Sequence, residues 1–114
     1  MNTPSADVPQ MSPQELKERL DNEQPLVLVD VREPREYVIA DLGKYEPVRL
    51  PVGELLDRME ELSQDDNLVI YCRSGARSAW AVKHLLAAGY DKVFNLDGGI
   101  LRWRRDVDPT LTAY

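Results

Sequence analysis

The sequence has one cysteine and one histidine among its 114 residues. A single cysteine excludes an internal disulfide, so the thiol is either a small buried apolar group or a reactive one. One cysteine and one histidine are also too few for a typical zinc site, and we predict no metal or other cofactor. A lone thiol persists most easily in a reducing compartment, which favours a cytoplasmic location.

Long apolar runs and an excess of positive charge are also missing. No apolar stretch is long enough to cross a bilayer, and the first ten residues, MNTPSADVPQ, lack the basic start and apolar core of a secretory signal. The formal net charge of −6 would repel nucleic acid and anionic membranes at long range. We therefore expect a cytoplasmic protein that binds neither nucleic acid nor membrane.

The sequence does contain a regular alternation of short apolar runs and amphipathic segments. Strands are predicted at residues 25–30, 68–71 and 93–96, with a weaker, proline-flanked edge strand at 47–52. Helices are predicted at residues 13–21, 33–42, 53–62, 75–88 and 100–107, the first with a capping-box start at Ser12. Such alternation in a chain of single-domain length predicts an α/β fold with a mostly parallel sheet and helices on both faces.

The cysteine, Cys72, stands directly after the predicted strand 68–71 and shortly before a predicted helix. Ligands gather at the carboxyl ends of parallel strands, and helix N-termini present unpaired N–H groups and a positive dipole end. Gly75 allows a tight turn, and Arg73 and Arg77 add positive charge. Because these groups favour the thiolate over the thiol, the sequence predicts a reactive or anion-binding loop, not a packing cysteine.

Two chemistries suit a nucleophilic cysteine in such a loop. Protein tyrosine phosphatases place five residues between cysteine and arginine, which makes a loop sized for a phosphoryl group. Here four residues separate Cys72 from Arg77, and Ser78 stands where the phosphatase arginine would be. The shorter loop is expected to surround something smaller, such as the outer sulfur of a persulfide. A small phosphatase or arsenate reductase using Cys72 is the alternative.

The run CRSGAR at residues 72–77 resembles the six-residue active loop of the rhodanese sulfurtransferases, in the C-R-x-G-x-R form associated with thiosulfate. VLVDVREPREY and GYDKVFNLDGGILRW resemble the upstream and carboxyl-terminal signatures of the same family. The resemblance is to a single-domain rhodanese and covers residues 8–105, leaving 1–7 as a flexible N-terminal segment and 106–114 as a tail. The ending GGILRWRRDVDPTLTAY most resembles rhodanese domains fused to adenylyltransferases that serve sulfur-carrier proteins.

This resemblance implies a three-layer rhodanese-like fold around a five-stranded sheet, and a sulfurtransferase activity. Cys72 would take sulfane sulfur from thiosulfate or a protein persulfide, hold it as a persulfide, and pass it to a thiophilic acceptor. The persulfide anion would be surrounded by the backbone N–H groups of the loop, which belong to Arg73, Ser74, Gly75, Ala76 and Arg77. A non-catalytic rhodanese-like interaction module is a further alternative.

The charged side chains around the loop have expected roles as well. Arg73 and Arg77 are expected to recognise an anionic donor such as thiosulfate, or a carrier's carboxyl terminus, unless they form a solvated face. Asp30 and Arg32 follow strand 25–30 and are expected to hold the active turn through an ion pair or hydrogen bonds. The partners that the resemblance implies are a sulfur-carrier protein, an adenylyltransferase or a cysteine desulfurase.

Other polar and aromatic residues are expected to be supporting or structural. Ser74 and Ser78 should hydrogen-bond within the loop or cap the helix. His84 should lie too far along that helix to act as a base for Cys72. Trp103 is expected in the core, with basic neighbours at the surface.

Overall fold

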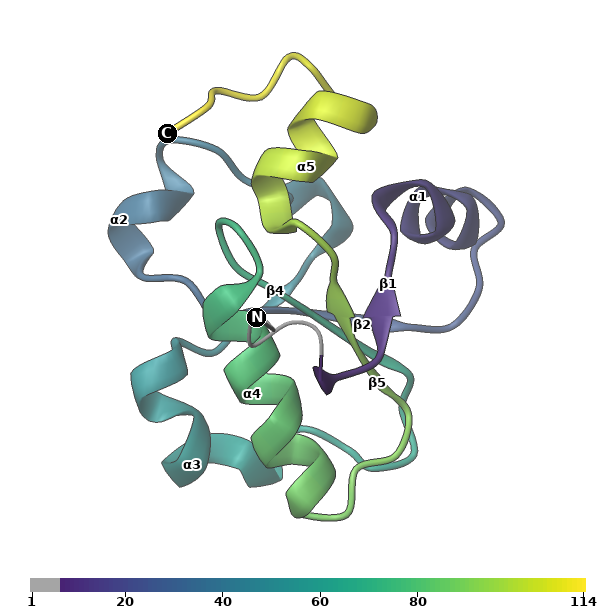
Figure 1. The fold of residues 1–114 in the computed structure, drawn as a ribbon, viewed down its shortest axis with the longest axis vertical. Helices are drawn as coiled ribbons and strands as arrows, with labels where there is room; N and C mark the ends of the chain where they lie inside the picture. Colours follow the sequence, from purple (N-terminus) through teal and green to yellow (C-terminus); the bar gives the residue numbers. More distant parts are fainter. Residues whose placement is uncertain (1–6) are drawn as a thin grey trace.

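The computed structural model describes residues 7–114, and a five-stranded parallel sheet runs through its centre in the order β1-β5-β4-β2-β3 (Figure 1). The strands are β1 (Gln10–Met11), β2 (Val27–Asp30), β3 (Val48–Arg49), β4 (Leu68–Tyr71) and β5 (Val93–Leu96). The predicted α/β class is thus confirmed, with every strand pair parallel. The predicted segment 1–7 lies outside the described residues, apart from Asp7.

Helices cover both faces of this sheet. They are α1 (Pro13–Asp21), α2 (Pro34–Tyr37), α3 (Leu55–Arg58), α4 (Ala76–Ala87) and α5 (Gly99–Asp106), with 3₁₀ turns η2 (Gly43–Tyr45), η3 (Val52–Glu54) and η4 (Met59–Glu61). Predicted helices 13–21, 75–88 and 100–107 agree with α1, α4 and α5 to within one residue at each end. Within residues 7–114, no helix has the length and apolarity that a membrane span requires.

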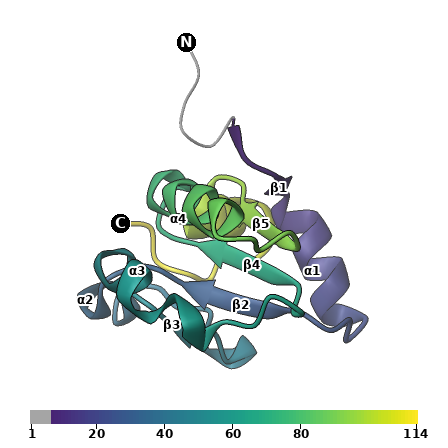
Figure 2. The same ribbon diagram turned by 90° about the horizontal axis from the view of Figure 1, so that it is seen from below.

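Alternating side chains of the buried strands divide the core into two clusters. On β4, Leu68 and Ile70 face α3 and α4, whereas Val69 and Tyr71 face α1 and α5. Figure 2 shows α3 and α4 on one side of the strands and α1 on the other. Cys72 continues the alternation after Tyr71, so its side chain belongs to the cluster beneath α4.

One strand was not predicted from the residues. Gln10 and Met11 lie in a segment that reads as polar turn, yet they pair with β5 as the edge strand β1. Gln10 lies opposite Asn95 and Met11 opposite Leu96, and bonds from Asn95 N–H to the Pro9 carbonyl (2.8 Å) and from Asp97 N–H to the Met11 carbonyl (2.9 Å) flank the pair. Two residues are too few to show a strand periodicity, so only the tertiary pairing defines this strand.

The helix predicted at 33–42 is a single turn, α2, in the structure. The buried guanidinium of Arg32 explains the early stop. Its Nη1 donates to the carbonyls of Ala40 (2.8 Å) and Glu36 (3.4 Å), which draws the chain into a turn around the arginine. The hydrogen-bonding demand of one buried charge therefore overrides the local helical pattern.

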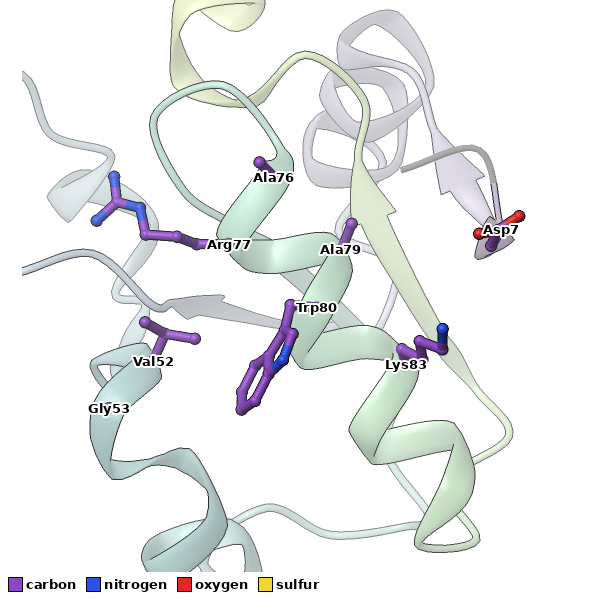
Figure 3. A pocket seen from close by; sticks show the side chains of 8 residues that line it. All are labelled: Asp7, Val52, Gly53, Ala76, Arg77, Ala79, Trp80 and Lys83. Atoms are coloured by element: carbon purple, nitrogen blue, oxygen red, sulfur yellow. The ribbon is translucent and has the colours of Figure 1, made fainter. Parts of the chain in front are cut away.

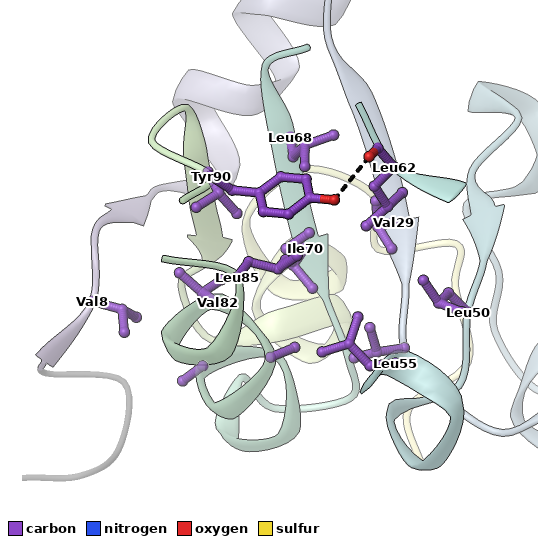
Figure 4. Close-up of a cluster of buried hydrophobic side chains, with 14 of the residues drawn as sticks. Val8, Val29, Leu50, Leu55, Leu62, Leu68, Ile70, Val82, Leu85 and Tyr90 are labelled. Carbon is purple, nitrogen blue, oxygen red and sulfur yellow. Dashed lines mark hydrogen bonds between the residues drawn. The ribbon is translucent and has the colours of Figure 1, made fainter. Parts of the chain in front are cut away.

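The helix predicted at 53–62 is likewise divided into η3, α3 and η4. At its end the hydroxyl of Tyr90 lies 2.9 Å from the carbonyl oxygens of both Met59 and Leu62, and Figure 4 shows the bond to Leu62. The Leu62 carbonyl thus binds a side chain that follows the end of α4, whereas the Met59 carbonyl also accepts the Leu62 N–H of η4 at 3.0 Å. Tyr90 thereby fastens this segment to the cluster beneath α4.

Replacing Tyr90 by phenylalanine keeps the ring but takes the hydroxyl donor from the Leu62 carbonyl, whereas the Met59 carbonyl still accepts the Leu62 N–H. We expect Tyr90→Phe to lower the free energy of unfolding in urea by about 1–2 kcal/mol, with an unchanged denaturant slope. Tyr45→Phe is the matched control, because the Tyr45 hydroxyl has no hydrogen bond to another residue of the described range. Equal unfolding midpoints for wild type and Tyr90→Phe would contradict the prediction.

Candidate active site

The loop between β4 and α4 places the thiol of Cys72 at a helix N-terminus. Cys72 is 1% exposed, and its Sγ accepts hydrogen bonds from the Gly75 N–H (3.1 Å) and the Ser78 hydroxyl (3.4 Å). Gly75 has a φ of +105°, a left-handed conformation that glycine adopts without strain. The sulfur therefore lies at the positive end of the twelve-residue helix α4.

The N-terminus of α5 holds this loop from behind. The N–H of Ile100 donates to the Cys72 carbonyl at 3.0 Å. The N–H of Leu101 donates to the Arg73 carbonyl at 3.1 Å. Gly99 permits this approach, because a Cβ there would lie 2.4 Å from the Arg73 carbonyl oxygen. Since the C=O and N–H of a trans peptide point in opposite directions, the N–H groups of these two peptides face away from α5.

The loop thus retains a set of free backbone donors beside the thiol. Gly75 already donates to Sγ. Across residues 7–114, no acceptor pairs with the backbone N–H groups of the other four predicted donors, which are Arg73, Ser74, Ala76 and Arg77. A sulfur anion bound in the loop can accept hydrogen bonds from them without displacing a protein group.

Arg77 is paired with a buried carboxylate that the sequence patterns do not single out. Its Nη1 and Nη2 donate to the two oxygens of Glu36 at 2.8 and 2.9 Å. Arg77 is the largest cause that lowers the pKa of Glu36 to about 2. Glu36 in turn raises the pKa of Arg77 above its usual range, so both groups are charged at neutral pH. Glu36 lies 41 positions before Arg77, and no local pattern links the two.

Arg73 binds the end of the chain, which returns to the site beside α2 (Figure 1). Its Nε donates to the backbone carbonyl of Tyr114, and its guanidinium carbon lies 5.2 Å from the centre of the Tyr114 ring. The Tyr114 hydroxyl donates to Glu36 (2.9 Å) and accepts from Arg32 (3.0 Å). Tyr114 is therefore a second residue of the site that sequence reasoning missed.

Asp30 and Arg32 lie at the same end of the sheet as Cys72, but on its opposite face. Arg32 is fully buried, and its Nε and Nη2 donate to the two oxygens of Asp30, each at 3.0 Å. Asp30 also accepts from the Tyr71 hydroxyl (3.1 Å) and from Arg49 of β3. Within the described range, neither Asp30 nor Arg32 bonds directly to loop residues 72–77. This ion cluster joins the ends of β2, β3 and β4.

The remaining predicted residues divide between the loop and the scaffold. Ser78 is fully buried and bonds to Sγ, whereas Ser74 is exposed. His84 lies in the last turn of α4, where its ring centre is 4.0 Å from that of Trp80. Trp103 is buried in the cluster under α1 and α5, as predicted.

Two hollows flank Arg77 at the mouth of the loop. The first, of about 560 Å³, lies between η3 and α4 and is lined by Val52, Trp80 and Lys83 among others (Figure 3). The second, of about 530 Å³, lies towards α2 and includes Val38 and Tyr114. Arg77 lines both, so the Arg77–Glu36 pair separates them.

Fold and loop together define a parallel α/β domain with a cysteine at the N-terminus of a helix, and known proteins are similar to it in sequence and in fold. The rhodanese-like domain model matches residues 12–106. A sulfurtransferase of Allochromatium vinosum is 41% identical over 98 residues, which are 86% of this chain and 90% of that protein. The probable adenylyltransferase/sulfurtransferase MoeZ of Mycobacterium tuberculosis is 32% identical over 91% of this chain, which spans only 26% of MoeZ. The chain belongs to the rhodanese-like domain family, which confirms the resemblance.

A solved structure agrees with this assignment. The rhodanese-like domain protein of Staphylococcus aureus superposes with a TM-score of 0.78 at 27% identity, covering 93% of this chain and 98% of that one.

A methyl group at Gly99 should push α5 off the loop. Besides the 2.4 Å contact with Arg73, the backbone there has a φ of +63°. We expect Gly99→Ala to cost about 2–4 kcal/mol in the free energy of unfolding and to shift the amide resonances of residues 73–75. Gly53→Ala is the control, because a Cβ at Gly53 would meet nothing within 4 Å and the φ there is ordinary. Matching stabilities for the two variants would refute the close approach.

Glu36 should also give the domain a defined pH dependence. Its pKa is lowered from 4.5 to about 2 in the folded protein, so its stabilising effect is complete above pH 4.5 and is lost as the pH falls towards 2. We expect Glu36→Gln to lower the free energy of unfolding by up to about 3 kcal/mol near neutral pH and by progressively less in acid.

The control for this pH series is Glu61→Gln, which removes a solvent-exposed partner of Arg58. Solvent screening should make its effect much smaller at every pH. Urea titrations of the three proteins across the acid range test the prediction. A stability difference for Glu36→Gln that stays constant from neutral pH into acid would be inconsistent with it.

Proposed function

We propose that this protein is a sulfurtransferase that carries sulfane sulfur as a persulfide on Cys72. The supporting observation is the position of Sγ, which accepts the Gly75 N–H at the start of α4 beside four backbone donors that are unpartnered in the described range. Similarity to proteins named sulfurtransferases supports the same activity.

In the first step the Cys72 thiolate attacks the outer sulfur of the donor. A new sulfur–sulfur bond forms as the bond to the leaving group breaks, and the bonding pair departs with sulfite, if the donor is thiosulfate, or with the donor's thiolate, if it is a protein persulfide. The negative charge then rests on the outer sulfur of the cysteine persulfide. The free loop N–H groups stabilise that charge in the way an oxyanion hole stabilises an alkoxide.

In the second step a thiophilic acceptor attacks the outer sulfur, takes it, and regenerates the Cys72 thiolate. With a thiolate as the attacking group in the first step and an anionic acceptor such as cyanide in the second, each sulfur–sulfur exchange proceeds without a base at the sulfur. This suits a site whose histidine, His84, stands at the opposite end of α4. Sulfur-carrier proteins, adenylyltransferases and cysteine desulfurases are the protein partners we propose. The name of MoeZ, which joins an adenylyltransferase to a sulfurtransferase, supports the second of these.

The side chains favour sulfur over phosphoryl transfer. A phosphatase needs an arginine that clamps the phosphoryl oxygens, and here Ser78 holds that place, buried and bonded to Sγ. Arg77 is turned towards Glu36. The loop therefore offers N–H donors around one sulfur atom. It has no arginine at the position that phosphoryl recognition requires.

Intact-mass measurements test the proposed reaction. The reduced wild type and Cys72→Ala are incubated separately with thiosulfate and with a persulfidated cysteine desulfurase, then measured without reductant. We expect the wild type to gain one sulfur atom from at least one donor and to lose it to cyanide or dithiothreitol, and Cys72→Ala to gain none. A wild type that gains no sulfur from either donor, or a variant that gains as much, would refute the proposal.

A further inference from the structure

The segment after α5 is held along its length before it reaches the loop. The Val107 N–H donates to the Trp103 carbonyl at 2.8 Å, and Arg104 Nε donates to the Leu111 carbonyl at 2.6 Å. Leu111 and Tyr114 also pack against the cluster under α5. The position of Tyr114 is therefore defined by several contacts of its own segment.

Tyr114 engages the two arginines of the active loop by different routes. It binds Arg73 directly, through its carbonyl oxygen and the face of its ring. It reaches Arg77 through Glu36, which accepts the tyrosine hydroxyl and both ends of the Arg77 guanidinium. The two charges expected to recognise an anionic donor are thus both occupied by the chain itself.

We propose that Tyr114 is a specificity-determining residue that covers the mouth of the loop and must be displaced before an anionic donor binds Arg73. This inference rests on the proposed sulfurtransferase function. A donor must replace the bonds that Tyr114 makes. Its apparent affinity is therefore its intrinsic affinity multiplied by the fraction of molecules in which Tyr114 is already displaced.

The cost of displacement falls unequally on different donors. A free small anion has only its interactions with the loop to offset that cost. A persulfide carried by a partner protein adds contacts outside the loop, such as with the two hollows beside Arg77, one of which Tyr114 itself lines. Tyr114 therefore biases the site towards protein-borne sulfur and against free thiosulfate.

Kinetics of Tyr114→Ala and Tyr114→Phe test this selectivity. Tyr114→Ala should lower the KM for thiosulfate by roughly three- to tenfold and change kcat by less than about twofold, because it removes the ring over Arg73 and the hydroxyl bonds that anchor it, and no reacting group. Tyr114→Phe loses the hydroxyl bonds but keeps the ring over Arg73, so its KM should fall less. The preference for a persulfidated protein over thiosulfate should decrease most in Tyr114→Ala and less in Tyr114→Phe.

Alkylation of Cys72 gives a readout that does not depend on sulfur transfer. The thiolate displaces iodide from iodoacetate, an anion, or from iodoacetamide, which is neutral. In Tyr114→Ala the rate with iodoacetate should rise at least about threefold and by more than the rate with iodoacetamide, because the ring no longer lies over Arg73 and the anion can approach that charge. Tyr45→Phe, a tyrosine that packs on Trp103, should leave both rates unchanged.

The two experiments separate the possible failures. If no protein transfers sulfur but iodoacetate reacts faster with Tyr114→Ala, the proposed function is wrong and the covering role of Tyr114 stands. If both the KM and the alkylation rates of folded Tyr114→Ala equal those of the wild type, or if the KM rises, the inference is overturned. Thermal unfolding of each variant establishes that it is folded.

Discussion

The pair of hydrogen bonds from the start of α5 to the carbonyls of Cys72 and Arg73 sets the shape of the whole site. By holding two carbonyls on one side, they leave the following N–H groups free on the other, where a sulfur anion can use them. The contact requires glycine at position 99, because a Cβ there would collide with the backbone of Arg73. The chemistry of the loop therefore depends on a turn that follows it in the chain by more than twenty residues and supplies no reacting group.

Charge is arranged around this loop in two clusters that lie on different faces of the sheet. Arg32 is fully buried, yet its guanidinium has Asp30, two carbonyls and the Tyr114 hydroxyl as partners. A buried ion pair with so many partners adds little net stability over an apolar core, but it fixes geometry, because any rearrangement would leave a charge unpaired. The second cluster, Glu36 with Arg77, is only partly shielded and meets the first at Tyr114.

Much of the fold could be predicted because its signals are local. Strands β2, β4 and β5 are short apolar runs, and the helices α1, α4 and α5 have a clear start or a clear apolar face. The motif CRSGAR likewise placed Cys72 at the junction of a strand and a helix. The predictions failed where tertiary contacts decide the outcome, as with β1, which exists only through its pairing with β5, and α2, which Arg32 cuts short.

The same reasoning explains which parts of the site could not be foreseen. Arg73 and Arg77 stand beside Cys72 in the sequence, so a role for them at an anion could be expected, but their actual partners come from 41 positions away in each direction. Glu36 lies inside the motif VLVDVREPREY, and nothing in the spacing of that motif shows that its carboxylate is aimed at α4. Tyr114 lies in a tail with no periodicity, where only the folded chain brings it to the loop.

The order of elements along the chain has a consequence for biosynthesis. A ribosome makes Cys72 and most of the sheet well before it makes α5, and domains fold as their last elements become available. A nascent chain that stops before Leu101 carries the thiol and both arginines but lacks a donor that orients the loop. The loop around the nucleophile is thus oriented only once the chain extends to Leu101 and α5 has begun to form.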